Sequence, residues 1–175
     1  YNLGLRPEKG MNYEVGVSYS GESVFASGDA LDVKVVAFYN DVDDKIIRDV
    51  TRNQSFYNID NAKIKGLEIE GRYAFKKFTG SAGITFIEGE GTNAAGATRK
   101  LNTIANNSLK LGLGYQATPD LKLGINSTFA AGRTQARGSF GGYSVHNIYA
   151  TYKPTEGPMR DVEVRMGVDN VTNKT

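Results

Sequence analysis

The chain has 175 residues and a formal net charge of +2, with a single His and no Cys. A charge this small, carried by dispersed Lys and Arg, argues against a nucleic-acid-binding surface. The lack of Cys excludes disulfides and thiolate metal sites. The length suits one domain, or part of one, over residues 1–175. No apolar run approaches the ~18 residues of a membrane-spanning helix. The first ten residues lack the apolar core of a signal peptide, which we expect upstream.

Apolar and polar residues alternate in runs of about ten, and turns separate the runs. From Leu121 to Phe129, for example, Leu121, Leu123 and Ile125 alternate with Lys122, Gly124 and Asn126. A strand places successive side chains on opposite faces, so each run has one apolar and one polar face. Runs of this length with aromatic ends are typical of transmembrane β-barrels. The predicted fold class is all-β: an antiparallel, up-and-down transmembrane β-barrel, present here as about eight strands.

The alternation places the strands along the chain and marks one irregularity. The strands are expected at about residues 12–19, 31–41, 57–75, 78–88, 107–116, 121–129, 143–152 and 161–170. The apolar side changes phase near Gly66 in the third strand, which predicts a bulge there.

The connections between these strands alternate in length. Short ones are expected at residues 76–77, 117–120 and 154–160, and long ones at 42–56, 89–106 and 132–142. Outer-membrane barrels have short periplasmic turns and longer extracellular loops, so the alternation predicts sidedness. The link at 20–30 should be periplasmic but is rather long. Aromatic residues at the two ends predict two girdles. They are Tyr19, Tyr73, Phe78, Tyr115 and Tyr152 at the short-turn ends, and Tyr13, Tyr39, Phe86 and Phe129 at the long-loop ends.

The predicted sidedness places both ends of this set of strands on the outer side. A free-standing bacterial barrel would be expected to begin and end on the periplasmic side. The expectation is therefore an interior slice of a larger barrel, with an unpaired strand edge at each end.

Four segments, in order along the chain, resemble TonB-dependent outer-membrane receptors. They are Leu5–Gly10 with Asn12–Gly16, Tyr57–Glu68, Gly142–Asn147 and Val168–Lys174. The resemblance covers essentially the whole chain. It implies a barrel of about 22 strands with a plugged lumen in the bacterial outer membrane. The plug domain and the final strand would lie outside this chain.

The resemblance also implies a function, which is active uptake of an iron compound across the outer membrane. The implied partners are the energy-coupling protein TonB, bound through an N-terminal segment outside this chain, the receptor's own plug domain, and outer-membrane lipid. Residues 28–34, 38–40 and 44–47 look more like receptors for haem, haemoglobin or haemophores. Residues 2–8 match those receptors only in part. The cargo is therefore left as haem or a ferric siderophore. The alternatives are a passive porin or structural barrel, and a soluble lipocalin-like ligand carrier.

Arginines on the long loops are the candidate ligand-binding residues. Guanidinium groups suit the carboxylates, catecholates or propionates of an anionic iron compound. The alternative is that they bind nothing in particular, or bridge anionic lipid. The candidates are Arg48, Arg52, Arg133 and Arg137.

Charges on the predicted polar face would line the barrel interior. They would either contact a plug or substrate path, or form interstrand charge pairs worth a few tenths of a kcal/mol each. The charges are Lys34, Glu68, Glu70, Arg72, Lys110, Lys122, Glu163 and Arg165.

His146 and an acidic cluster are two further candidate sites. His146 could ligate haem, but a structural role in the outer girdle is favoured. Asp41, Asp43 and Asp44 could bind Ca²⁺, but they lack the rest of a ligand set. Without a triad, a zinc site or a phosphate loop, no catalytic site, no bound metal and no intrinsic cofactor are expected, and the protein is not expected to be an enzyme.

Overall fold

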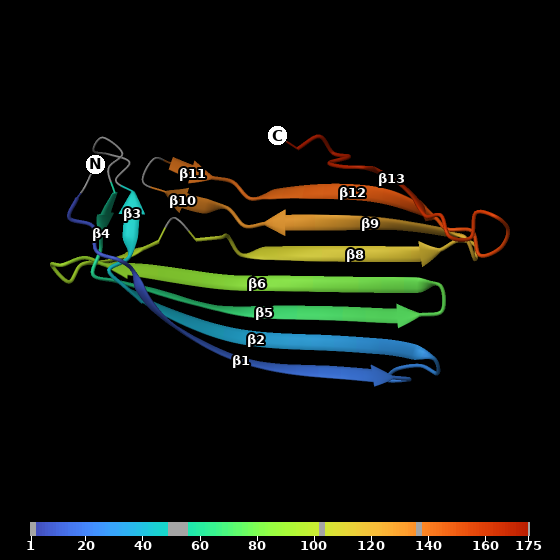
Figure 1. The fold of residues 1–175 in the computed structure, drawn as a ribbon, viewed down its shortest axis with the longest axis horizontal. Coiled ribbons are helices and arrows are strands. Elements are labelled where there is room, and N and C mark those ends of the chain that lie inside the picture. Colours follow the sequence, from blue (N-terminus) through green and yellow to red (C-terminus); the bar gives the residue numbers. More distant parts are fainter. Residues whose placement is uncertain (1–2, 49–55, 102–103, 136–137, 175) are drawn as a thin grey trace. The chain divides into compact units, whose positions relative to one another are not determined.

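The computed structural model describes residues 3–48, 56–101, 104–135 and 138–174, and the regular structure in them is entirely β-strand (Figure 1). The strands are β1 (Lys9–Glu22), β2 (Asp29–Asp43), β3 (Ile46–Arg48), β4 (Phe56–Asn58), β5 (Asn61–Phe75), β6 (Phe78–Thr92), β7 (Thr98–Lys100), β8 (Ser108–Gln116), β9 (Leu121–Ala130), β10 (Arg133–Gln135), β11 (Gly138–Phe140), β12 (Tyr143–Tyr152) and β13 (Val164–Val168). Among the described residues, no helix is long and apolar enough to cross a membrane.

The long strands form one sheet in the order β1-β2-β5-β6-β8-β9-β12-β13, with β7 added beside β6. The pairings β6–β8, β8–β9, β9–β12 and β12–β13 are all antiparallel. The all-β, up-and-down antiparallel fold is therefore confirmed. The expected strand at 143–152 matches β12, and the strand predicted from Leu121 matches β9 to within one residue.

The chain divides into two compact units, and four of the long strands pass through both. The first unit comprises Tyr1–Gly16, Val36–Leu67 and Phe86–Ala105, and includes the hairpin formed by β3 and β4. The second comprises Val17–Val35, Glu68–Thr85 and Asn106–Thr175, and includes β8 to β13.

The large apolar side chains lie on the surface. Val15 is 72% exposed, Phe78 62% and Leu113 65%. Among the described residues the buried apolar side chains are few, namely Val36, Ile59, Ala62 and Pro154. Such an arrangement is the reverse of a soluble protein, where large exposed apolar patches are rare. The outward apolar face is the one predicted from the alternation.

Aromatic rings lie at the short-turn ends of β6 and β8, where Phe78 and Tyr115 were predicted, whereas Tyr13 and Tyr39 lie four residues inside β1 and β2. The Phe78 and Tyr115 rings lie 4.9 Å apart, because the two residues pair directly across β6 and β8. The Tyr13 and Tyr39 rings lie 6.4 Å apart. Phe25, which the girdle prediction left out, lies 6.1 Å from the Tyr73 ring.

The third predicted strand, 57–75, is wrong as one continuous element. It is divided into β4 and β5 at Ile59 and Asp60. The Asp44 N–H donates to the Asp60 carbonyl at 2.9 Å, and the Ile59 N–H donates to the Lys45 carbonyl at 2.8 Å. These bonds close the base of the β3–β4 hairpin, and the Ile59 side chain is buried.

The predicted long links carry strands of their own. Residues 42–56 contain the end of β2, β3 and the start of β4, with Ile46 opposite Asn58. Residues 89–106 contain the end of β6 and the added strand β7. The link 132–142 contains the β10–β11 hairpin. Short segments with too few alternating positions give no clear periodic signal, so the sequence did not reveal them.

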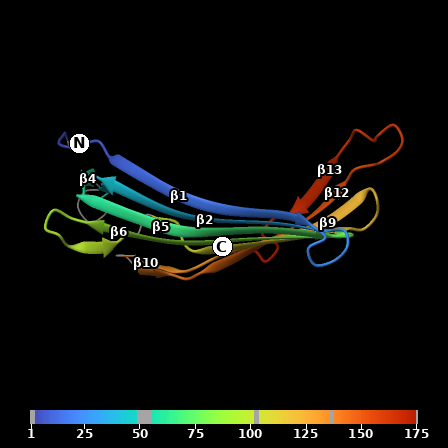
Figure 2. The same ribbon diagram turned by 90° about the horizontal axis from the view of Figure 1, so that it is seen from below.

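The last predicted strand, 161–170, is shorter than expected, because β13 begins at Val164. The Val162 N–H donates to the Met159 carbonyl at 2.9 Å, and Gly157 has a positive φ of 83°. These turns lengthen the connection from β12, which extends beyond the strand ends at the right of Figure 2. At the other end, β13 stops at Val168, and Asn170, two residues further on, takes a left-handed φ of 50°.

Gly66 lies inside an unbroken β5, and the predicted bulge there stays a prediction. The structure gives this glycine a different role, because a Cβ atom at residue 66 would overlap the Phe38 ring and lie 2.6 Å from the Phe86 carbonyl oxygen. The absence of a side chain at residue 66 therefore makes room for Phe38.

The rather long link between β1 and β2 is a compact turn built around Asp29. This carboxylate is 1% exposed and accepts hydrogen bonds from the N–H groups of three turn residues, Val24, Phe25 and Ala26, at 2.7–3.0 Å. The Tyr73 hydroxyl donates a further bond at 2.9 Å. One carboxylate thus accepts hydrogen bonds from backbone N–H groups that would otherwise lack a partner. This arrangement explains why the link between β1 and β2 is rather long.

Candidate functional site

The polar face of the second unit presents small residues between its charges. In the register of β8, β9 and β12, Lys110 lies opposite Thr128, Gly112 opposite Asn126, and Lys122 opposite Thr151. Opposed residues of an antiparallel pair share a face. Lys110, Lys122 and Asn126 therefore lie on the predicted polar face.

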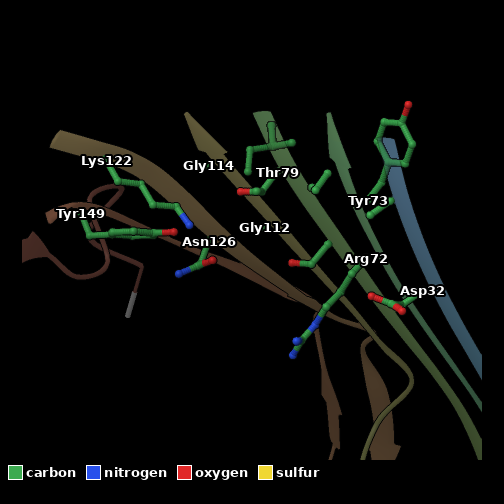
Figure 3. Close-up of a pocket in the computed structure, with 14 residues that line it drawn as sticks. Asp32, Arg72, Tyr73, Thr79, Gly112, Gly114, Lys122, Asn126 and Tyr149 are labelled. Carbon is green, nitrogen blue, oxygen red and sulfur yellow. The ribbon is translucent and has the colours of Figure 1, made fainter. Parts of the chain in front are cut away.

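A hollow of ≈ 510 Å³ lies on this face (Figure 3). Its polar lining comes from β2, β5, β6, β9 and β12, and glycines of β8 contribute to its wall. In Figure 3 the Tyr73 ring points away from the Arg72 side chain, as expected for neighbouring residues on one strand. The polar and charged lining residues are Asp32, Arg72, Tyr73, Thr79, Ser81, Lys122, Asn126 and Tyr149.

The Tyr149 ring lies over Gly124, its partner across β9 and β12. A Cβ atom at residue 124 would overlap this ring, with the Cε1 atom only 2.6 Å away. The Arg165 guanidinium lies 4.5 Å from the ring centroid, a cation–π distance. Packing against the Gly124 backbone and the stacked cation thus hold the ring, and its hydroxyl is left to face the hollow.

Lys122 reaches along the same wall over another glycine. A Cβ atom at Gly114 would lie 2.9 Å from the Lys122 Cε atom. At Gly112 a Cβ atom would lie 3.1 Å from the Asn126 Oδ1 atom. Without glycines here, the hollow would be partly filled and the lysine stem displaced.

The eight predicted interior charges do not pair with one another. Within the described part of the chain, none of them forms an ion pair; the ion pairs of the structure join other residues, for example Lys65 and Glu88. The interpretation as interstrand charge pairs is therefore wrong for these strands. The reason is visible in the register, where Lys110 and Lys122 oppose threonines rather than acids.

In the first unit, the segment before β1 is clasped to the base of the β3–β4 hairpin. Arg6 and Asn58 exchange two hydrogen bonds, from the Arg6 N–H to Oδ1 at 2.8 Å and from Nδ2 to the Arg6 carbonyl at 2.9 Å. The Arg6 guanidinium also pairs with Asp44 at 2.6 Å. The resemblance pointed to the segment that contains Arg6, but the sequence did not reveal this contact.

Glu8 adds a second fastening to the same hairpin. Its carboxylate accepts a hydrogen bond from the Ile46 N–H at 2.8 Å and pairs with Lys45 at 2.9 Å. The Ile46 N–H, and then Lys45, hold the pKa of Glu8 below its ordinary value, because both favour the charged form. The hairpin that bears Arg48 is therefore tied to residues 6–8 at two points.

Two of the four candidate arginines lie among the described residues, and two do not. Arg48 ends β3 in the first unit and is exposed, and Arg133 begins β10 in the second unit and is also exposed. Arg52 and Arg137 lie outside the described residues. Convergence of the four on one ligand stays a prediction.

The remaining candidates have structural partners. The His146 Nδ1 atom lies 2.8 Å from the Ser127 hydroxyl, and its ring meets Phe129 edge-on at a centroid distance of 5.5 Å. These contacts fit the structural role favoured for His146. Asp41 and Asp43 accept hydrogen bonds from the Asn61 amide. In the described ranges, no cluster of three or more acidic or His side chains could hold a metal ion.

Comparison with known families identifies the chain. The family "TonB dependent receptor-like, beta-barrel" matches residues 1–171. The chain belongs to this family. The family is one of outer-membrane receptors and transporters, so the protein is placed in the bacterial outer membrane, as predicted, and the soluble lipocalin-like alternative is set aside.

Curated relatives are named for haem. The chain is 24% identical to "Heme/hemopexin utilization protein C" of Haemophilus influenzae, over 99% of this chain and 27% of the relative. It is 36% identical to the "Hemophilin receptor" of Acinetobacter baumannii, over 39% of this chain and 6% of that protein. The chain thus spans about a quarter of the length of the relatives that match it throughout.

Solved structures show the same fold. The "Copper transporter OprC" superposes with a TM-score of 0.78 at 21% identity, over 97% of this chain and 26% of that one. The FrpB iron transporter from Neisseria meningitidis gives 0.68 at 18% identity, over 98% of this chain and 28% of its own. The ferric enterobactin receptor PfeA from Pseudomonas aeruginosa gives 0.68 at 20% identity, over 98% and 27%.

Proposed function

We propose that residues 1–175 form part of the barrel domain of a receptor that imports an iron compound across the outer membrane, driven by TonB. The single observation that carries the proposal is the family match over residues 1–171. The outward apolar face and the polar inner face support it, because a transport barrel needs both.

Haem is the cargo that the relatives favour. Relatives named for haem and hemopexin match 99% of this chain, whereas the proteins named for copper, iron and ferric enterobactin share 18–21% identity and support the fold alone. A ferric siderophore is the alternative cargo. The cargo is a substrate, and the receptor itself carries no cofactor in this proposal.

The partners follow from this function. TonB binds an N-terminal segment, and the receptor's own plug domain fills the lumen; both lie outside residues 1–175. Outer-membrane lipid covers the apolar face. A haemophore or another haem protein delivers the cargo to the outer loops.

Capture is assigned to the outer loops through Arg48, Arg52, Arg133 and Arg137. The cargo is anionic, and a guanidinium can donate two parallel hydrogen bonds to a carboxylate. Attachment of the Arg48 hairpin to residues 6–8 supports this assignment, because a fixed loop loses less entropy on binding than a free one.

The test is binding and uptake of haem by the full-length receptor with Ala at all four positions. A well-placed charge-assisted hydrogen bond contributes about 1.5–3 kcal/mol, so affinity should fall by at least tenfold. Arg160→Ala is the matched control, because Arg160 lies in the β12–β13 connection on the predicted periplasmic side. Wild-type binding of both haem and ferric siderophores by the fourfold variant would remove the loops as the capture site.

A further inference from the structure

On the β9 and β12 side of the hollow in Figure 3, three polar side chains have no hydrogen-bond partner among the described residues. Lys122 and Asn126 flank Gly124 on one face of β9, and Tyr149 lies opposite Gly124 on β12. Diagonal neighbours on one face of a sheet lie within about 8 Å, so long side chains there can meet. In Figure 3 the ends of the three side chains are directed toward the same part of the hollow.

The ammonium of Lys122 has no counterion. In the described residues it forms neither an ion pair nor a hydrogen bond, and the side-chain amide of Asn126 and the hydroxyl of Tyr149 form no hydrogen bond either. The nearby carboxylates have other partners, since Asp32 accepts from the Ser20 hydroxyl and Asp120 accepts from Thr155. Lys122 therefore forms no ion pair with any carboxylate of the described residues, including Asp32, which lines the same hollow.

The surrounding wall adds to this positive potential. Lys110, Lys122 and Arg165 lie on the polar face of β8, β9 and β13, and the two acids of the same parity, Glu163 and Asp169, lie just outside β13. Arg165 is held against the Tyr149 ring rather than against an acid. The space beside Lys122, Asn126 and Tyr149 stays open, because the Tyr149 ring is fixed and nothing larger than a hydrogen atom projects from Gly112 or Gly114.

We propose that Lys122, Asn126 and Tyr149 form a seat for a carboxylate on the inner wall of the barrel. An ammonium, an amide N–H and a phenol O–H are three donors, and a carboxylate offers about four lone-pair sites on two oxygens. The carboxylate comes either from a side chain of the receptor outside residues 1–175 or from a free ligand. The seat itself does not depend on the identity of the cargo, and only the free-ligand source rests on the proposed transport function.

Zero-length crosslinking tests the seat directly. A carbodiimide joins an amine and a carboxylate only when the two groups touch, and peptide mass spectrometry then identifies both partners. The purified full-length receptor would be treated in detergent without added ligand, and again with citrate as the probe for a free carboxylate. Lys110 is the internal control, because it is the same residue type on the same face of the next strand but does not line the hollow.

The expected result is an amide at Lys122 with a yield at least tenfold above that at Lys110. A crosslink without citrate to an Asp or Glu outside residues 1–175 assigns the seat to the receptor's own chain. An adduct that appears only with citrate assigns it to a free ligand. No adduct in either arm, an equal yield at Lys110, or a crosslink to Asp32 or another acid of residues 1–175 would overturn the proposal.

Two conservative variants separate a built seat from a merely exposed lysine. Tyr149→Phe keeps the ring over Gly124 and removes only the hydroxyl, and Asn126→Leu keeps the approximate volume and removes the amide. Each should lower the yield at Lys122 by roughly fivefold, the effect of one lost hydrogen bond. The yield at Lys110 should not change. An unchanged yield at Lys122 in both variants would contradict the seat, whatever the result for iron uptake.

Discussion

A matched pair of arginine substitutions on β9 tests which face of the sheet meets lipid. Ile125 lies on the apolar face, opposite Leu113 on β8 and Ile148 on β12. Asn126, the next residue, lies on the polar face opposite Gly112. Ile125→Arg and Asn126→Arg introduce the same side chain one residue apart, so only the face differs.

The size of the effect follows from the position of Ile125 along the strand. The 10 residues of β9 rise about 3.3 Å each, and at a tilt of about 40° they cover roughly 25 Å. Ile125 is near the middle of this height, where Arg on the lipid face costs about 2–4 kcal/mol. Leu121→Arg, at the strand end, should cost about 0–1 kcal/mol. Asn126→Arg should cost little, because its side chain stays in a polar interior.

The assay is unfolding by urea of the full-length receptor in phospholipid vesicles, read from the heat-dependent shift of the barrel in electrophoresis. The expected order of stability is Asn126→Arg above Leu121→Arg, with Ile125→Arg lowest. If Ile125→Arg were as stable as Asn126→Arg, the assignment of the two faces would be refuted. If Leu121→Arg cost as much as Ile125→Arg, the depth argument would be refuted.

Three further changes probe the local structure of the full-length receptor. Gly66→Ala should destabilise it by about 1–3 kcal/mol through overpacking, as measured by urea unfolding. Adding Phe38→Leu should recover part of this lost stability. An unchanged stability in Gly66→Ala would contradict the overlap between a side chain at residue 66 and the Phe38 ring. Because folding lowers the pKa of Glu8, the stability that its carboxylate contributes is full above the ordinary carboxyl pKa and is lost as pH falls through the pKa of the folded state. Hydrogen exchange at the Ile46 amide, which donates to Glu8, should accelerate over that pH range. Glu8→Gln should remove this pH dependence. Tyr73→Phe should loosen the β1–β2 turn and lower the melting temperature, whereas an unchanged melting temperature and unchanged exchange in the turn would show that its hydroxyl does not support the Asp29 carboxylate.

Strands with one apolar and one polar face were predictable from sequence, because the alternation is a direct consequence of backbone geometry. The apolar–polar alternation from Leu121 to Phe129 predicted strand β9, and it also predicted the face on which Lys122 and Asn126 lie. Successive side chains alternate between the two faces of a strand whichever strands lie beside it. One sequence is therefore enough to predict which residues share a face.

The features that escaped prediction depend on contacts between distant residues. The division of the third strand at Ile59 is imposed by two backbone hydrogen bonds, from the Ile59 N–H to the Lys45 carbonyl and from the Asp44 N–H to the Asp60 carbonyl, and Asp44 and Lys45 lie on another part of the chain. The clasp between Arg6 and Asn58 spans 52 residues and has no local pattern. Local propensity cannot anticipate such contacts, because tertiary context decides them.

The candidate site was predicted only in part, for the same reason. The apolar–polar alternation placed Lys122 on the polar face. It could not show that Tyr149 lies over Gly124, or that the neighbouring glycines leave a hollow. A tyrosine opposite a glycine becomes visible only once the register between β9 and β12 is known. Two of the four candidate arginines, Arg48 and Arg133, lie among the described residues, in strands rather than open loops.

The most direct test of the proposed function is uptake of labelled iron, supplied as haem or as a ferric siderophore, by cells with and without TonB. The cells would carry the full-length receptor, with equal surface expression confirmed. An energy-coupled importer predicts accumulation against the concentration gradient only when TonB is present, with haem favoured over the siderophore. Uptake at the same rate without TonB would show a passive pore and contradict the account.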